Sequence, residues 1–305
     1  MANWGVCTTV KAPLEQILAF VAHHLTLGAD RIWLYFDDPD DRAIATLQQF
    51  EKVEITRCDA AYWASFRAGR PDRHQNRQGQ NMRRCYKWTN LPWLCHIDID
   101  EFILPKLPVF AVLDATPQEA NMIRMAPWEA LCDPSLEDDI FTARQFRGAL
   151  RERNNNTVRK AVFREFEFLL PDGTLSHAAG KCFFRTGLRG FQPRLHGAVG
   201  KRGLEVSPHV QNDLALLHFH AQDRERWLER LPFRLERGAY RENLGLTTYL
   251  NVCGKAGCLS FYDRVQVATP EMLDQLRSVG ALIEADLTLR QKVAELMAYT
   301  AHPAP

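Results

Sequence analysis

The sequence has no long apolar run and almost no net charge. No segment approaches the roughly 18 consecutive apolar residues of a membrane-spanning helix, and the start lacks the basic residues and apolar stretch of a signal peptide. We therefore expect neither a membrane span nor a signal peptide. The formal net charge is +1, so charge alone argues neither for nor against a nucleic-acid partner.

The sequence also has no Cys-x-x-Cys motif. Eight cysteines are spread along the chain, and several of them lie within apolar runs. A chain of 305 residues with 46% hydrophobic residues can build one large core or two small ones without disulfides. We expect reduced thiols in a cytoplasmic protein, with peripheral attachment to the inner membrane face as a second option.

Apolar segments alternate between strand and helix patterns in the first third of the chain. Strands are predicted over residues 4–10, 31–36, 53–57 and 93–102, with helices between them. This order predicts an α/β fold with a mostly parallel, Rossmann-like central sheet and flanking helices. Further along, we expect a strand over residues 158–169 and two C-terminal helices, the first starting at Thr269-Pro270 and the second spanning residues 281–299.

Two acidic clusters follow predicted parallel strands, over residues 37–41 and 98–101. The carboxyl ends of parallel strands share one edge of the sheet, where open α/β sheets bind ligands. In an extended chain Asp98 and Asp100 share a face, about 7 Å apart. Together they can hold Mg²⁺ or Mn²⁺, which favour carboxylate, water and phosphate oxygens. The alternative is that these acids only solvate the end of a strand.

A basic helix is predicted over residues 72–89, before the strand that leads to Asp98. Residues 65–87 contain seven Lys or Arg and a single acid, Asp72. Gln78, Asn81 and Arg84 lie on neighbouring turns of this helix. It is either a solvated face or a cationic wall for phosphates, which Arg and Lys suit. Its aromatic residues do not interleave with the basic ones, so we expect no nucleic-acid partner.

Four motifs, taken in order, resemble a bacterial family 2-type glycosyltransferase of the Asp-x-Asp-Glu-Phe branch. They are Val10-Lys11 before a helix, the strand end Tyr35-Phe36-Asp37-Asp38, the helix residues Arg77, Gln78 and Asn81, and the segment from His96 to Phe102. The resemblance covers roughly residues 5–240. It implies a GT-A fold, a UDP- or GDP-linked sugar donor, and Mn²⁺ or Mg²⁺. One departure is Ala12-Pro13, where the family has Asn-Glu; Glu15 is a possible substitute for that acid.

The resemblance also assigns roles to individual residues. It implies that Asp98, Asp100 and His218 bind the metal, with His220 as the rival of His218. Contacts to the sugar donor are expected from Val10, Lys11, Asp37 or Asp38, Gln78, Asn81, Asp98, Lys181 and His196, and the basic helix adds Arg84. An inverting transferase needs a carboxylate base, and the candidates after Trp128 are Glu129 and Asp133, with Glu137, Asp138 and Asp139 in the same loop.

We therefore expect a transferase domain over residues 1–240, with a nucleotide-sugar half (1–104) and an acceptor half (105–240). Residues 241–305 form a helical extension through which the chain can oligomerise. The expected activity is hexosyl transfer to a carbohydrate or glycoconjugate acceptor, in bacterial surface polysaccharide or glycoconjugate synthesis. Two alternatives are a nucleotidyltransferase, which usually has a Gly-rich loop that residues 10–14 lack, and a non-catalytic carbohydrate- or protein-binding module. A zinc site of His218, His220, Cys253 and Cys258 is a weaker option because its ligand spacing is unusual.

Overall fold

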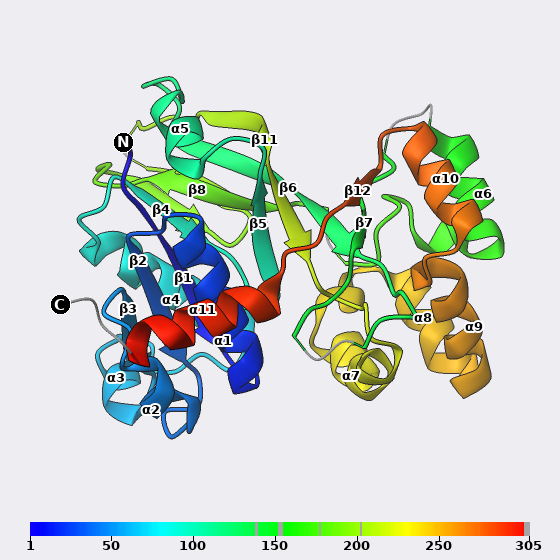
Figure 1. The fold of residues 1–305 in the computed structure, drawn as a ribbon, viewed down its shortest axis with the longest axis horizontal. Coiled ribbons are helices and arrows are strands. Elements are labelled where there is room, and N and C mark those ends of the chain that lie inside the picture. Colours follow the sequence, from blue (N-terminus) through cyan, green and yellow to red (C-terminus); the bar gives the residue numbers. More distant parts are fainter. Residues whose placement is uncertain (138–139, 152–154, 177, 202, 302–305) are drawn as a thin grey trace. The chain divides into compact units, whose positions relative to one another are not determined.

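The computed structural model describes residues 1–137, 140–151, 155–176, 178–201 and 203–301 (Figure 1). The chain forms two compact units. The first contains Met1–Ala126, Gly180–Leu216 and the chain from Thr288 onward, and the second contains Pro127–Ala179 and Leu217–Leu287. Strands β6 (Met122–Ala130) and β11 (Pro208–His218) have residues in both units.

The first unit contains the parallel strands that the sequence predicted. The order β4-β1-β2-β3 is parallel throughout, and β8 pairs with β4 in the antiparallel direction, as does β6 with β8. The bounds of these strands are β1 Trp4–Val10, β2 Arg31–Phe36, β3 Val53–Arg57, β4 Trp93–His96 and β8 Lys181–Arg185. Strand β5 (Glu101–Pro105) pairs with β11, and β9 (Phe191–Arg194) with β10 (Gly197–Gly200).

Helices cover this sheet because their apolar residues recur on one side. Helix α4 (His74–Trp88) places Met82 and Cys85 against Cys7, Tyr35 and Leu94 of the strands. Helix α1 (Leu14–Thr26) is buried along most of its length and ends before Gly28, whose positive φ suits the reversal of the chain. The shorter helices are α2 (Ala43–Leu47), α3 (Ala60–Ala64) and α5 (Val109–Asp114).

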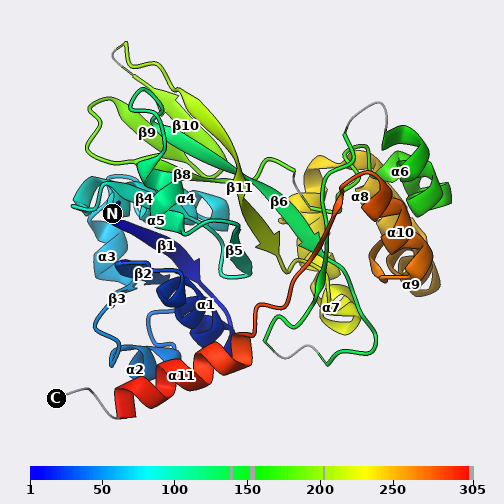
Figure 2. The same cartoon turned by 45° about the horizontal axis from the view of Figure 1, so that its top comes forward.

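Helix α11 (Leu289–Ala301) lies beside α1 within the first unit, as both cartoon views show (Figures 1 and 2). The Lys292 ammonium donates to His23 Nδ1 at 3.2 Å, and His23 Nε2 donates to the Ile103 carbonyl at 2.8 Å.

The helix predicted over residues 281–299 is wrong at its start. Leu282–Glu284 instead forms strand β12, and Thr288 has a positive φ of 48° just before α11.

The second unit packs helices around its own apolar core. Strand β7 (Gln145–Arg147) pairs with the end of β6 and with β12, both antiparallel. Its helices are α6 (Asn156–Phe163), the 3₁₀ helices η2 (Arg164–Leu169) and η3 (Ala239–Glu242), α7 (Arg224–Glu236), α8 (Leu244–Val252), α9 (Gly254–Gln266) and α10 (Pro270–Ser278). Helix α10 begins as predicted, because the Thr269 side chain accepts from the Met272 N–H and Pro270 occupies the first turn.

The strand predicted over residues 158–169 is wrong, because this segment forms α6 and η2. Val158, Val162, Phe166 and Leu169 are all buried in one core. Their spacing of three or four residues is that of one helix face, whereas the apolar composition alone resembles a buried strand.

The predicted α/β class is confirmed, with helices flanking a sheet whose parallel strands are β1–β4. The added antiparallel pairs make the sheet mixed. Of the helices described, none is long and apolar enough to cross a membrane. The compact units join segments that are distant in sequence, whereas the division at residues 104 and 240 follows the chain. That division stays a prediction.

Two fully buried histidines make the stability of the first unit depend on pH. Burial lowers the pKa of His24 to about 3, and burial followed by the Lys181 charge lowers the pKa of His96 to about 3. The unfolded chain takes up these protons near the ordinary value of 6.5. Between these two values the unfolded state binds more protons, so stability is complete above pH 6.5 and is lost as the pH falls towards 3.

We expect the chain to lose about 2 kcal/mol of unfolding free energy per buried imidazole between pH 7.5 and pH 5. In His96→Met the loss over this interval should be smaller by that amount, because one titrating group is gone. Urea unfolding followed by circular dichroism at both pH values measures the difference. The same pH dependence in both proteins would contradict the assignment to His96.

Candidate functional site

Polar side chains gather in the first unit where strands β2 and β4 end and α4 begins. Asp37 follows β2, and Asp98 follows β4. Arg77 and Gln78 lie in the first turns of α4 and contact these two carboxylates. The predicted edge therefore exists within this unit, and α4 supplies its donors.

Asp98 begins a tight turn rather than continuing β4. The strand ends at His96, the Glu101 N–H donates to the Asp98 carbonyl at 3.0 Å, and the Asp98 N–H donates to Glu101 Oε2 at 2.7 Å. The assumption that Asp98 and Asp100 alternate along an extended strand is therefore wrong. Both residues lie on a turn that the Glu101 side chain closes.

Lys181, the first residue of β8, is a buried cation beside this turn. Its side chain is 1% exposed, and its ammonium lies 2.8 Å from Asp98 Oδ2 and 3.6 Å from Glu101 Oε2. Burial by itself lowers the pKa of this ammonium, but the two carboxylates raise it above its ordinary value. Lys181 therefore stays charged and holds the turn to β8.

The second oxygen of Asp98 contacts α4. Gln78 Nε2 donates to Asp98 Oδ1 at 2.6 Å, while the Asp98 side chain remains 25% exposed. Asp98 thus connects α4, the turn and β8 and still reaches the surface. Gln78 and Lys181, two residues predicted to contact the donor, are brought together at this carboxylate.

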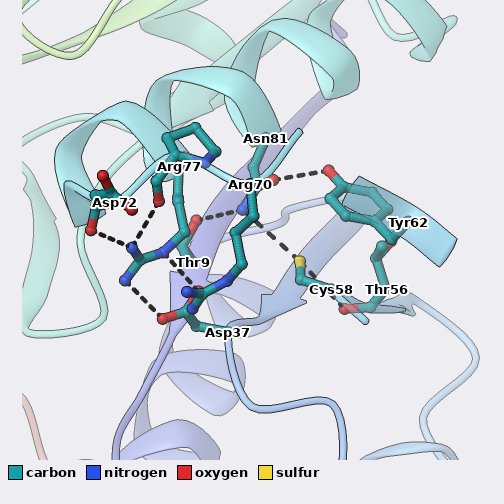
Figure 3. A network of polar contacts seen from close by, with 10 residues as sticks. Thr9, Asp37, Thr56, Cys58, Tyr62, Arg70, Asp72, Arg77 and Asn81 are labelled. Carbon is teal, nitrogen blue, oxygen red and sulfur yellow. Dashed lines mark hydrogen bonds and ion pairs between the residues drawn. The ribbon is translucent and has the colours of Figure 1, made fainter. Parts of the chain in front are cut away.

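Asp37 is held by two arginines (Figure 3). Arg77 binds it through two nitrogens, with Nε 2.7 Å from Oδ1 and a terminal nitrogen donating to Oδ2 at 2.9 Å. A terminal nitrogen of Arg70 lies 3.0 Å from Oδ1. Arg77 also donates to the carbonyls of Pro71 and Asp72, at 3.0 and 2.7 Å. This fork fixes the chain before α4 to the end of β2.

Asn81 connects α4 to three other elements (Figure 3). Its Nδ2 donates to Thr9 Oγ1 of β1 at 2.9 Å and approaches Cys58 Sγ at 3.9 Å. The Tyr62 hydroxyl donates to Asn81 Oδ1 at 2.7 Å. Asn81 is buried, and both polar atoms of its side chain are hydrogen-bonded. Its position therefore favours a role in holding α4 in place.

Arg84 is directed towards α3 rather than towards Asp98. It donates to Ser65 Oγ at 2.7 Å, and its guanidinium carbon lies 4.9 Å from the Tyr62 ring centre and 5.3 Å from that of Phe66. These contacts occupy the guanidinium in packing. The role of Arg84 as a phosphate ligand stays a prediction.

The other residues of the first unit that were predicted to contact the sugar donor differ in exposure. Val10 is buried and its carbonyl accepts from the Asp37 N–H at 3.2 Å, whereas Lys11 and Asp38 are exposed. His196 is half-buried, and its Nδ1 donates to the Gly180 carbonyl at 2.8 Å. Burial and the nearby Lys181 charge lower the pKa of His196, so it is neutral near pH 7.

Glu129, a predicted base, lies in the second unit inside a buried ion pair. Its Oε2 is 3.0 Å from an Arg147 nitrogen, and both side chains are at most 1% exposed. The N–H groups of Leu175 and Ser176 also donate to this carboxylate, at 2.8 and 2.5 Å. Burial alone raises the pKa of Glu129, but Arg147 and these donors bring it below its ordinary value. A carboxylate held this way is a poor proton acceptor, and the geometry favours a structural role.

The other acids predicted near Trp128 are closer to the surface. Asp133 is half-buried, and its Oδ1 accepts from the Ser135 N–H at 2.9 Å and from the Ser135 hydroxyl at 2.7 Å. Glu137 is exposed, and Asp138 and Asp139 lie outside the described residues. The identity of a catalytic base therefore stays a prediction, with Asp133 less constrained than Glu129.

His218 and His220 lie at the end of β11 in the second unit. His218 is buried and its Nδ1 lies 3.3 Å from Ser176 Oγ, while His220 Nε2 lies 3.1 Å from the Tyr240 hydroxyl. Within the described residues no group of three or more His, Cys, Asp or Glu side chains is placed to hold a metal ion. The zinc site of His218, His220, Cys253 and Cys258 is therefore wrong, and metal binding by His218 stays a prediction.

The contacts of three residues near Asp37, Asn81 and Asp98 were not predicted from the sequence. Glu101 belongs to the acidic motif, but only the turn reveals that it closes on the Asp98 N–H. Arg70 and Tyr62 lie in the loop and short helix before α4, where no spacing pattern relates them to Asp37 or Asn81. Such long-range pairs follow from the fold alone.

No family model matches the chain, and no curated protein matches it. Solved structures with some likeness include HddC from Yersinia pseudotuberculosis, with 9% identity, a TM-score of 0.36, and coverage of 75% of this chain and 97% of that one. Residues 1–349 of TarS from S. aureus show 9% identity and a TM-score of 0.36, covering 98% and 87%. Glucosyl-3-phosphoglycerate synthase from Mycobacterium tuberculosis shows 12% identity and a TM-score of 0.30, covering 60% and 57%. Likenesses of this size do not assign the chain to a family.

Removal of the Lys181 charge should destabilise the first unit strongly. In Lys181→Met the fully buried Glu101 loses its cation, and we expect a loss of about 3–5 kcal/mol of unfolding free energy, the usual cost of breaking a buried pair. Urea unfolding measures this loss, with the exposed Lys106→Met as the matched control. Adding Glu101→Gln to Lys181→Met should recover part of the loss, and a loss below about 1 kcal/mol would contradict the buried pair.

The two possible roles of Glu129 predict different results. Glu129→Gln keeps the shape but leaves the Arg147 guanidinium buried without its anion, so we expect a loss of about 3 kcal/mol or more. The exposed Glu137→Gln should unfold like the original chain. A stable Glu129→Gln protein with no activity would instead favour the role of Glu129 as the base.

Proposed function

We propose that the chain is a metal-dependent glycosyltransferase. It takes a UDP- or GDP-linked sugar as donor and transfers the sugar to a hydroxyl of a carbohydrate or glycoconjugate acceptor. The proposal rests on the Asp-x-Asp-Glu-Phe resemblance together with one structural observation. That observation is the Asp98–Glu101 turn, which stands at the carboxyl end of a parallel strand beside a helix that provides Gln78 and Arg77.

In this proposal a divalent ion is held at the turn by two carboxylates. Mg²⁺ commonly binds through one or two carboxylates and keeps several waters for substrate phosphates, so a cage of three protein ligands is not required. A carboxylate has about four lone-pair positions, so the bonds from Gln78 and Lys181 do not by themselves fill Asp98. In this proposal Asp98 and Asp100 hold the ion, which neutralises the charge of the donor pyrophosphate.

The protein residues supply orientation and charge around that ion. Lys181 and Gln78 each donate to a different oxygen of the Asp98 carboxylate, so that both oxygens are positioned before the sugar donor arrives. Asp37, held by Arg70 and Arg77, is the group proposed to face the nucleoside. The transfer itself needs a base for the acceptor hydroxyl, for which Asp133 is the candidate that the buried ion pair does not constrain.

The turn should carry the metal-dependent part of nucleotide binding. We expect Asp100→Asn to weaken the binding of UDP or GDP at least about tenfold in the presence of Mn²⁺, equal to about 1.4 kcal/mol, and to leave binding in EDTA unchanged. Isothermal titration measures both affinities. The matched control is Asp114→Asn, on the exposed acid that ends α5.

Circular dichroism must show that Asp100→Asn remains folded. An unchanged Mn²⁺-dependent affinity in the folded variant would remove the basis of the proposal. Labelled sugar donors distinguish the remaining classes. A glycosyltransferase releases the nucleoside diphosphate, whereas a nucleotidyltransferase forms or cleaves the pyrophosphate bond. A binding module leaves the sugar donor unchanged.

A further inference from the structure

Two thiols meet in the second unit, whereas every residue assigned to donor binding belongs to the first. Cys253 caps the start of α9, and Cys258 lies in the second turn of the same helix. Their sulfur atoms are 3.5 Å apart. All eight cysteines lie within the described residues and are free. Cys253 is half-exposed, and the other seven are buried.

The backbone around this pair is shaped to let the two sulfurs approach. A Cβ at Gly257 would lie 2.5 Å from Cys253 Cβ and 3.0 Å from its Sγ, closer than side chains pack, so only glycine leaves room for Cys253 there. Gly254 adopts a positive φ of 67° directly after Cys253. The Leu250 carbonyl lies 4.0 Å from Cys253 Sγ and 3.6 Å from Cys258 Sγ.

We propose that Cys253 and Cys258 are a redox-active dithiol that closes to an intramolecular disulfide. A disulfide needs the sulfurs about 2.05 Å apart, so they must approach by about 1.5 Å. The bond closes a loop of only six residues, so it constrains the unfolded chain less than a bond across a long loop would. Such a bond suits reversible oxidation rather than structural cross-linking.

The oxidant is a small-molecule disulfide such as glutathione disulfide. The half-exposed Cys253 thiolate attacks one sulfur of the oxidant, which releases one glutathione thiolate and leaves a mixed disulfide on Cys253. The Cys258 thiolate then attacks the Cys253 sulfur and releases the second glutathione. Two protein thiols lose two protons and two electrons, and one glutathione disulfide becomes two glutathione thiols.

The order of attack follows from exposure. Burial and the adjacent Cys253 raise the pKa of Cys258 to about 11, so it reacts poorly with solutes but is held beside the mixed disulfide. Cys258 also lines a surface groove of about 860 Å³ formed by α7, α8 and α9, together with Leu228, Leu231, Leu250 and Leu259. Oxidation therefore alters one wall of this groove.

Peptide mapping tests the disulfide directly, without an activity assay. Lys255 lies between the two cysteines, so trypsin separates them into peptides 242–255 and 256–264, which stay joined only through a disulfide. The full chain is reduced, desalted, treated with glutathione disulfide, blocked with N-ethylmaleimide and digested. We expect the joined peptides, and their loss after treatment with dithiothreitol.

Matched variants make the result specific. Cys258→Ser should stop at the mixed disulfide on Cys253, and Cys253→Ser should leave Cys258 unmodified. Gly257→Ala should slow closure several-fold because it displaces Cys253, whereas Gly245→Ala, whose Cβ would have only ordinary contacts, should not. A mixed disulfide as the end product in the original chain, no reaction at Cys253, or equal oxidation of the other cysteines would overturn the proposal.

Discussion

The buried ammonium of Lys181 is the interaction on which the candidate site of the first unit depends. It stands between Asp98 and Glu101 and ties the turn after β4 to the start of β8. A buried cation is tolerated only with anions close by, and these anions are the same carboxylates that shape the turn. The charge that stabilises the fold and the charge proposed to serve the ligand therefore cannot be varied independently. Any substitution in this group alters both stability and binding.

A second constraint comes from α4, which is both a packing and a polar element. Met82 and Cys85 bury one side of the helix against the sheet, and its first turns present Arg77 and Gln78 to the two aspartates. The bonds of Asn81 to Thr9 and Tyr62 fix the helix along its length. The position of Arg77 and Gln78 therefore follows from the packing and the hydrogen bonds of other residues of the same helix.

Much of the first unit was predictable from sequence because its elements are local and periodic. The strands β1, β2 and β3 and the basic helix occur where alternation and helical spacing indicated them. The segment 158–169 was misjudged because an apolar run fits a buried strand and a buried helix equally well. Asp98 and Asp100 were assigned to the predicted edge, but the turn that bends them away from the strand direction depends on Glu101 and Lys181, which lie far apart in sequence. Glu129 was a candidate base in the sequence, and its burial beside Arg147 depends on the pairing of β6 with β7.

The packing of α11 on α1 has a consequence for how the chain is made. Lys292 and His23 are 269 residues apart and meet within one unit. During synthesis α1 leaves the ribosome early, whereas its partner helix emerges only after the whole second unit has been translated. Until then, other contacts or a chaperone must cover the surface of α1 that packs on α11. The first unit is therefore completed only after the second has had time to fold.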